Sequence, residues 1–432
     1  MWAALTLLLA CAGAAPPRGT LPVLTPADTD PAAGYERPRK LRASDLWPPE
    51  VVRGPHHRVL ESVSTDGFLH IYAIDSDFGA FEAAGDLSLR LHVQDIRALA
   101  ALRDVAESAA FRAARSRART QPFVARWNLV TAPVEALVGM PPEAWREVLR
   151  IAGLSPGERS PDEVRVRRGV AAFEATKRRL ARRLGVNPYS LNGVLQVELN
   201  RVAWVCAAGG LSLERLPSLA ESSLAPQPED VIPADRLARL YQFDSPEDLR
   251  RRNRIELAVM GLENAMIDAF LEHPAYSPRQ QTGVVESLVA IEPARDRAAY
   301  VKVALRAATP ADPVLYLMNA LLLRAHHQHV APVERIVEVG PRIAAAYTEE
   351  RKLVVPAQVD YLLWTRPTER FVRRVAQADP AELEITAREI WLSGTASALA
   401  RREIERLGIR VVERSFEQTF RRLAPAEDAP GG

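Results

Sequence analysis

The stretch from Phe173 to Leu213 constrains the fold most, because it holds the most regular apolar stripe in the chain. Two helical patterns meet there at the break Gly185-Val186-Asn187-Pro188. In the second pattern apolar side chains recur at helical spacing, which places them on one face of a helix. These side chains are Leu191, Leu195, Leu199, Val202 and Cys206. We predict two helices joined by a turn, the second with one face buried in a core.

Composition narrows the class of protein. A chain of 432 residues exceeds one typical domain of about 100–200 residues, which favours two or three domains. The net charge of +2 is too small to imply nucleic acid as a partner. The only cysteines, Cys11 and Cys206, exclude a disulfide framework and a structural zinc set. Because Cys206 lies on the apolar stripe, we expect a buried thiol.

The N-terminus indicates export. Trp2 to Ala10 is an uninterrupted run of apolar and small residues, too short for a bilayer span of about 20 residues but typical of the core of a secretory signal. Ala12-Gly13-Ala14 is a small-x-small cleavage site, whereas Leu8 to Cys11 is a lipobox in which Cys11 would be acylated. No Lys or Arg precedes the run, which departs from the usual signal. A disordered, mildly apolar tail is the alternative.

Two changes in sequence composition follow this leader. Residues 15 to 57 are rich in Pro, Ala and charge without any period, which is typical of a flexible tether. Val59–Thr65 and Phe68–Ile74 then flank Asp66-Gly67, which predicts a β-hairpin with a type I′ turn. Phe78–Ala83 is the expected third strand. A helix from Leu91 to about Ser116 supplies the apolar cover that three strands need.

The segment from Gln121 to Leu154 is sparsely charged and contains Trp127 and Trp145. It could lie on a lipid surface with both indoles at headgroup level. The alternative, short helices packed under the hairpin, is favoured because the segment lacks a Lys/Arg-rich polar face.

Residues 165–183 are strongly basic. Their cations form like-charge pairs four residues apart, which destabilise an isolated helix. An anionic lipid surface or an acidic partner would offset that repulsion, and a plain solvated helix face is the alternative. The candidate anion-binding residues are Arg165, Arg167, Arg168, Lys177, Arg178, Arg179, Arg182 and Arg183.

After a linker at 216–234, the chain shows legible helix starts. Ser245-Pro246 and Ser277-Pro278 each place a capping serine before a proline at the first helical position. Ile255, Val259 and Leu262 are the predicted buried face of the first of these helices.

A core helix is predicted farther on. Val314 to Leu323 is apolar all round, and ten residues are too few for a membrane span. His326, His327 and His329 follow, but only His326 and His329 share a helix face, so we predict no metal site there.

The C-terminal part alternates strands and helices, which favours a small parallel sheet. Expected strands are 335–339, 343–347, 353–355, 359–364, 389–392 and 409–412, and expected helices are 367–378 and 397–407. Ligands of such sheets bind beyond the carboxyl ends of the strands, which here predicts a ligand-binding or anion-binding set of Arg366, Ser393, Gly394, Thr395 and Ser397. Alternatively, Ser397 is a helix N-cap and Gly394 a turn residue.

The overall prediction is an α+β protein, predominantly helical, with an N-terminal hairpin, a helical middle and a C-terminal α/β module. The predicted parts are a signal peptide or lipoprotein signal (1–14), a tether (15–57), a hairpin-plus-helical domain (58–215), a linker (216–234), a helical domain (235–330), an α/β domain (331–420) and a disordered tail (421–432).

No catalytic motif, cofactor motif or metal motif stands out. We therefore expect an exported, non-catalytic cell-envelope protein, periplasmic or anchored as a lipoprotein, which binds protein partners or an anionic membrane surface. A small-molecule or anion-handling enzyme, with its site at the carboxyl edge of the C-terminal sheet, is the alternative.

Overall fold

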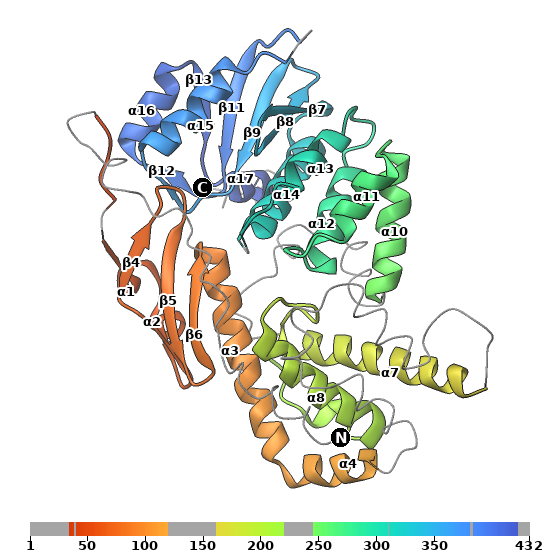
Figure 1. Cartoon of the computed structure of the whole chain (residues 1–432). Helices are drawn as coiled ribbons and strands as arrows, with labels where there is room; N and C mark the ends of the chain where they lie inside the picture. The colour runs from red at the N-terminus through yellow and green to blue at the C-terminus, as the bar shows by residue number, and fades with distance from the viewer. Residues whose placement is uncertain are drawn as a thin grey trace, which may run out of the picture.

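The computed structural model describes residues 34–38, 40–119, 161–219, 245–309, 311–380 and 383–421. It confirms a mixed α+β fold with a helical majority, an N-terminal antiparallel sheet and a C-terminal sheet (Figure 1). Residues 1–33 and 120–160, which include the predicted leader and the segment with Trp127 and Trp145, lie outside the described residues.

The N-terminal sheet is built around strand β5. Its strands are β1 (Leu41–Arg42), β2 (Arg53–Gly54), β3 (His57–Val59), β4 (Ser62–Thr65), β5 (His70–Ser76) and β6 (Gly79–Ala84), with the short helices α1 (Ala43–Leu46) and α2 (Pro49–Val52) beside them. β6 pairs along one edge of β5, and β3 and β4 pair one after the other along the opposite edge. The strand expected at 59–65 is divided: β3 ends at Val59 and β4 begins at Ser62. Between them, the Glu61 carbonyl accepts the N–H of Ala43.

The hairpin between β4 and β5 forms at Asp66-Gly67, as predicted, but its loop is longer than a two-residue type I′ turn. Thr65 pairs with His70, which leaves four residues in the loop. The Asp66 carboxylate accepts the N–H groups of Phe68 and Leu69, both at 2.8 Å, and so organises the wider loop. The backbone at Phe68 is thereby free to face the C-terminal module.

The helical part next to this sheet contains α3 (Asp86–Glu107), α4 (Ala109–Arg119), α7 (Pro161–Leu184), α8 (Gly193–Gly209) and a short 3-10 turn, η4 (Leu213–Arg215). The single helix expected up to Ser116 is two helices, because the Ser108 hydroxyl accepts the N–H of Phe111 and starts α4 anew. The break after α7 is confirmed, with Gly185 at φ 67°.

The apolar stripe of α8 fills the core of this helical part. Leu195, Leu199 and Val202 are completely buried, and Cys206 is buried beside them. Leu191 differs from the prediction: it lies before the helix start and is 55% exposed. A side chain at Gly209 would collide with the carbonyl of Ala114, so glycine there lets α8 touch α4.

The middle helices are α10 (Pro246–Val259), α11 (Asn264–Leu271), α12 (Pro278–Val289), α13 (Ala298–Ala304) and α14 (Asp312–His329). The predicted caps are confirmed: Ser245 starts α10 and Ser277 starts α12 with a full capping box. The predicted buried face was wrong for Ile255 and Val259, which are 59% and 70% exposed, whereas Leu262, just after the helix, is buried as predicted. The face that turns inward carries Asn253, whose amide donates to the Thr282 hydroxyl at 3.0 Å.

The C-terminal sheet has the order β13-β11-β9-β8-β7, parallel among β9, β11 and β13 and antiparallel among β7, β8 and β9. Its strands are β7 (Val333–Gly340), β8 (Ile343–Thr348), β9 (Lys352–Ala357), β11 (Ala387–Leu392) and β13 (Ile409–Val412). The expected strand 359–364 lies outside this sheet: only β10 (Tyr361–Leu362) is extended, and it pairs with β12 (Thr395–Ala396).

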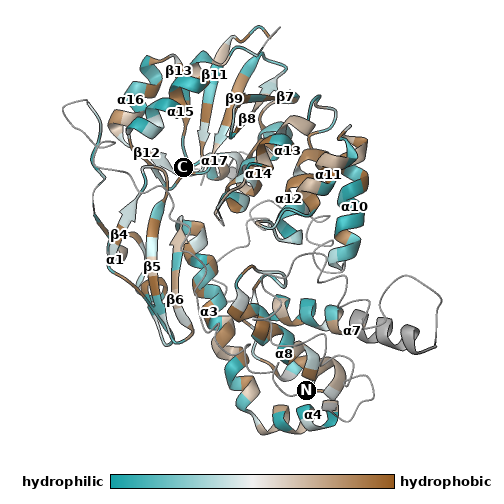
Figure 2. Cartoon of the chain, in the orientation of Figure 1, coloured by the Kyte–Doolittle hydropathy of each residue, from teal (hydrophilic) through white to brown (hydrophobic). Residues whose placement is uncertain are grey.

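Two helical layers cover this sheet. One face packs against α15 (Arg366–Gln377) and α16 (Ala398–Arg406), and the other against α14 and α17 (Ser415–Arg421), as Figure 1 shows. One core cluster contains residues of the middle helices and of the sheet together. Most apolar residues of α14 are buried in this cluster, and Figure 2 shows the hydrophobic colouring along its ribbon.

Candidate functional site

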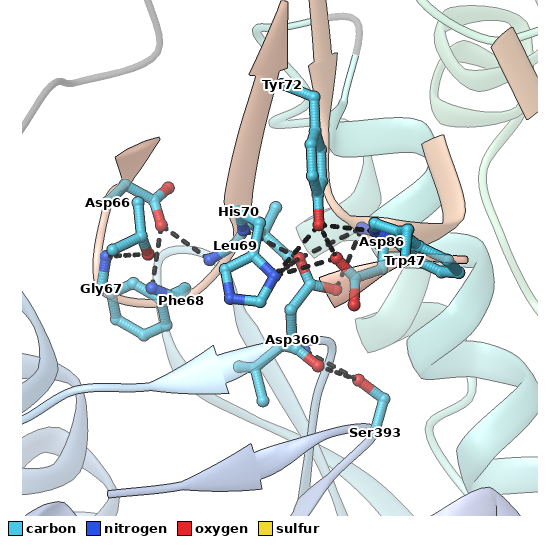
Figure 3. A network of polar contacts seen from close by, with 12 residues as sticks. Trp47, Asp66, Gly67, Phe68, Leu69, His70, Tyr72, Asp86, Asp360 and Ser393 are labelled. Carbon is cyan, nitrogen blue, oxygen red and sulfur yellow. Dashed lines mark hydrogen bonds and ion pairs between the residues drawn. The ribbon is translucent and has the colours of Figure 1, made fainter. Parts of the chain in front are cut away.

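The candidate site lies where the N-terminal sheet meets the C-terminal module. Strand β9 ends at Ala357, and the loop that follows turns back at Asp360. The Asp360 N–H donates to the carbonyl of Phe68, and the Leu363 N–H donates to the carbonyl of Gly67, both at 2.9 Å. The hairpin loop thus covers the carboxyl edge of the C-terminal sheet, as Figure 3 shows from close by.

The Asp360 carboxylate reaches across this junction to the start of α3. It accepts the N–H of His70 at 2.8 Å and the N–H of Asp86 at 3.1–3.2 Å. Asp86 is the first residue of α3, and Gly85, in the N-cap position with φ 97°, has no side chain to cap the helix. A carboxylate from 274 residues away along the chain therefore satisfies an orphan N–H at the positive end of the helix dipole.

Three further side chains complete the cluster. His70 Nδ1 lies 2.9 Å from Asp86 Oδ1, and the Tyr72 hydroxyl donates to the same oxygen at 2.5 Å. The indole N–H of Trp47 donates to the Tyr72 oxygen at 3.0 Å. The Tyr72 side chain is completely buried, and the side chains of His70 and Asp360 are 7% and 4% exposed.

The cluster shifts the pKa values of its members. Burial raises the pKa of Asp360 to about 7, reinforced by the negative charge of Asp86 and opposed by the two backbone N–H donors. Burial opposes protonation of His70, but the hydrogen bond and charge of Asp86 outweigh it, so the pKa of His70 is raised. Burial, followed by the charge of Asp86, raises the pKa of Tyr72, which therefore remains a hydrogen-bond donor.

The donor set resembles that of a metal site. His70, Asp86 and Asp360 each offer a ligand atom, all within 4.8 Å of one another, and imidazole with carboxylates suits several divalent ions. Both oxygens of Asp360 already accept backbone N–H groups, however, and Asp86 Oδ1 accepts two side-chain donors. A metal ion would have to replace these bonds. The arrangement as it stands is a charged, fully hydrogen-bonded junction.

Three of the five predicted ligand residues of the C-terminal module gather around the Asp360 loop, where their polar groups bind the chain itself. The Ser393 hydroxyl bonds both backbone groups of Val359 at 2.7 and 2.8 Å. A Cβ on Gly394 would lie 2.2 Å from the Asp360 carbonyl oxygen, so glycine permits the close approach of two loops. The Thr395 N–H donates to the same Asp360 carbonyl at 3.3 Å.

The other two predicted residues, Ser397 and Arg366, lie at the starts of helices. The Ser397 hydroxyl accepts the N–H of Ala400 at 2.9 Å, which confirms the alternative reading of Ser397 as an N-cap. Arg366 is the first residue of α15, and its guanidinium lies 5.7 Å from the ring centroid of Tyr35. A role of the five residues in ligand binding stays a prediction.

The predicted basic set lies on α7, and three of its described members turn to partners within the chain. Lys177 is buried and donates to the Gln196 amide oxygen at 2.8 Å. Arg178 donates to the Tyr189 hydroxyl at 3.3 Å, and Arg183 donates to the Leu216 carbonyl at 2.7 Å. Arg179 and Arg182 are exposed. The side chains of Arg165, Arg167 and Arg168, and the whole of Cys11, lie outside the described part.

The three histidines at the end of α14 diverge. His326 is 3% exposed and packs edge-on against Trp391 with ring centroids 4.7 Å apart. Burial lowers its pKa to about 4, so it is neutral at physiological pH. His327 Nδ1 instead accepts the N–H of Val333 at 3.0 Å.

A second candidate site is a cavity of about 530 Å³ between the β5–β6 turn, α3 and α8. Its lining residues are Asp77, Phe78, Leu99, Arg103, Ala106, Glu107, Val194, Glu198 and Arg201. The Arg103 guanidinium lies 4.2 Å from the Phe78 ring centroid. The apolar side chains of Leu191, Val194 and Val197, all on or just before α8, are 55%, 42% and 37% exposed.

Sequence reasoning missed both sites. His70 and Asp360 are 290 residues apart in the sequence, and no spacing links them. The signal for the cavity was available in part, because Val194 and Val197 lie off the apolar stripe of α8.

Comparisons of the chain with protein-family models, with curated proteins and with solved structures found no match. None of the helices in the described ranges combines the length and apolar character that a bilayer span requires.

Proposed function

We propose that this chain is a non-catalytic binding module of the cell envelope and that its partner is a protein. The observation that carries the proposal is the cavity between α3 and α8, which exposed Val194 lines, with exposed Leu191 and Val197 three residues before and after Val194 in the chain. Clustered apolar side chains exposed at the rim of a cavity are typical of interaction surfaces.

The lining chemistry favours a protein segment over a small apolar ligand. Two cations, Arg103 and Arg201, alternate with carboxylates at Asp77, Glu107 and Glu198. Charges of both signs around an apolar strip match the polar rim and apolar centre of a protein interface. A partner helix with one apolar anchor and charged flanks would match both the apolar lining and the surrounding charges.

The geometry of the C-terminal sheet weighs against the enzyme alternative. In a parallel sheet the carboxyl edge is the usual ligand site. Here the Gly67–Leu69 loop hydrogen-bonds to that edge, and the polar groups of Ser393 and Thr395 are used within the chain. An enzyme centred there would first have to lift the N-terminal sheet away.

The basic helix supports a protein partner more than an anionic membrane. Attraction to anionic lipid is worth about 1 kcal/mol for each cation near the surface. Lys177, Arg178 and Arg183 donate to groups within the chain, so Arg179 and Arg182 are the predicted lipid-facing cations that remain exposed among the side chains described.

Export is proposed from the apolar run Trp2 to Ala10 and the lipobox ending at Cys11. Membrane fractionation in the native host tests it. An acylated Cys11 would place the protein in the membrane fraction, and Cys11→Ser would move it to the soluble fraction. A protein recovered from the cytosol with its leader intact would contradict export.

Photo-crosslinking in the native host tests the binding surface. A photoreactive amino acid replaces Val194 or Val197 on α8, and a matched chain carries it at Val259, an equally branched and more exposed residue on α10. We expect one discrete protein adduct from positions 194 and 197, absent at 259, and lost when the other α8 valine is changed to Asp. Equal labelling at all three positions, or no adduct at 194 and 197, would contradict the proposal.

A further inference from the structure

The described segment 34–38 lies against the C-terminal module, although it belongs to the predicted tether. Glu36 makes the main contacts there. Its N–H donates to the Trp364 carbonyl at 2.8 Å, and its carboxylate accepts the Trp364 N–H at 2.6 Å. The same carboxylate oxygen accepts the Ser397 hydroxyl at 2.5 Å. One glutamate therefore joins the starts of two helices, because Trp364 precedes the N-cap of α15 and Ser397 is the N-cap of α16.

Tyr35 docks next to it. Its hydroxyl donates to the Glu369 carboxylate, which is also held by Arg373. The guanidinium of Arg366 lies 5.7 Å from the tyrosine ring centroid, within the range of a cation–π contact. Tyr35 is partly buried against the core cluster that fills the space between the sheet, α15 and α16.

The surface that holds Tyr35 and Glu36 is formed by Trp364, Arg366, Glu369 and Ser397, and it makes three kinds of contact with them. The backbone of Trp364 accepts the N–H of Glu36 and donates its own N–H to the Glu36 carboxylate. Two helix starts favour a negative charge at the position of the Glu36 carboxylate. Glu369 accepts a phenolic hydroxyl while Arg366 covers the ring. The ligand that fits is an extended Tyr-Glu segment.

We propose that this surface is a peptide-binding site for an extended Tyr-Glu segment, and that Tyr35–Glu36 occupies it as a releasable latch. The latch holds this segment on the C-terminal module shortly before β1 begins the N-terminal sheet at Leu41. Tyr35 and Glu36 are only half-buried, so they can lift off while the rest of the chain remains folded. Opening frees residues 34–38 from the C-terminal module and exposes the site.

Amide hydrogen exchange at Trp364 reports occupancy directly, because its N–H donates to Glu36. The full chain is compared with a Tyr35→Ala/Glu36→Ala variant that empties the site. Glu50→Gln, an exposed glutamate on α2, is the matched control. We expect exchange at Trp364 to become about tenfold faster in the emptied variant, as for an amide released by local opening, and to be unchanged in the control.

A peptide added in trans then tests recognition. Acetylated Ala33–Pro38 peptide, at a few millimolar to match the effective concentration of a tethered segment, should restore slow exchange at Trp364 in the emptied variant. The same peptide with Gln in place of Glu36 should not. The wild-type chain should show no change with either peptide, because its own segment fills the site.

Each other outcome overturns the proposal. Unchanged exchange at Trp364 in the emptied variant would show that the segment does not occupy the site. No restoration by the native peptide would show that the surface does not recognise the sequence, and equal restoration by the Gln peptide would show that it does not recognise the carboxylate. If the double variant fails to fold, Glu36→Ala alone takes its place with the same readouts.

Discussion

Two carboxylates join the N-terminal part of the chain to the C-terminal module, and they do so by the same chemistry in opposite surroundings. Asp360 and Glu36 each accept hydrogen bonds from groups at the start of helices. Asp360 is 4% exposed, faces His70 and Asp86, and accepts backbone N–H groups of two residues. Glu36 is half-buried and accepts one N–H and one hydroxyl.

The difference teaches that burial, more than the number of bonds, decides what such a contact does. A buried donor that loses its acceptor keeps the full cost of desolvation, whereas an exposed donor finds water. The donors to Glu36, Trp364 and Ser397, are themselves buried, so the Glu36 contact breaks only when the half-buried Tyr35–Glu36 segment lifts off and admits water. The Asp360 junction lies inside the molecule and has no such route, so it is a permanent structural element.

Asp360→Ala is expected to have the largest effect. It leaves the backbone N–H groups of His70 and Asp86 without their acceptor and removes the carboxylate that lies 3.9 Å from the His70 imidazole, so we expect a loss of about 3–5 kcal/mol of unfolding free energy. Urea unfolding measures it. Asp75→Ala, which removes an exposed carboxylate paired with Arg58, should cost less than about 1 kcal/mol. Equal losses in the two variants would refute the structural role of Asp360.

Gly394→Ala perturbs the same junction by steric collision, without removing a hydrogen-bonding group. The added Cβ would lie 2.2 Å from the Asp360 carbonyl oxygen and 2.6 Å from that of Val359, and both are backbone atoms that cannot rotate away. We expect a loss of about 1–3 kcal/mol, as for an overpacked core. Gly193→Ala, at a helix start with nothing within 4 Å of the new atom, is the control and should be neutral or stabilising. A neutral Gly394→Ala would show that the two loops are not held in contact.

The pH dependence of stability should separate Asp360 from ordinary carboxylates. Its pKa is raised to about 7, so the folded chain holds a proton that the unfolded chain has already released above pH 4. Stability from this group is therefore lost as pH rises from about 4 to about 7, by at most about 1.4 kcal/mol per pH unit. The raised pKa of His70 has the same sign and acts above about pH 6.5, its usual value.

Asp360→Asn removes the titratable carboxyl group of Asp360 and leaves that of His70 in place. Urea unfolding at several pH values should give a shallower decline for Asp360→Asn than for wild type between pH 4 and 7, and Asp75→Asn should follow wild type. Parallel curves for wild type and Asp360→Asn would mean that Asp360 stays ionised in the folded chain.

Local chemistry explains which parts of the fold could be predicted. Ser245 and Ser277 start their helices as expected because a hydroxyl before a proline caps a helix wherever the helix lies. The buried face of α10 was wrong because Leu249 and Leu257, spaced two turns apart with Asn253 between them, form a competing stripe that is the one buried.

The junction itself was beyond sequence reasoning for the same reason. Nothing in the residues around His70 or Asp360 indicates that they meet. Among the residues expected to bind an anion, Ser397 donates to a carboxylate, that of Glu36, whereas Gly394 lies against backbone carbonyls. Helix-start chemistry therefore predicted an anion at Ser397, but it could not predict that the chain supplies the anion itself as Glu36.

Glu36→Gln should have the smallest effect on global stability and so complete the contrast. The amide oxygen still accepts hydrogen bonds from Trp364 and Ser397, and Glu36 itself is only half-buried, so the free energy of unfolding should fall by less than about 1 kcal/mol. Urea unfolding of Glu36→Gln, Glu50→Gln and wild type should give midpoints close together, whereas Asp360→Asn should fall well below all three. A loss at Glu36→Gln as large as that at Asp360→Asn would mean that burial does not distinguish the two carboxylates, and that Tyr35–Glu36 is a fixed part of the core and not a latch.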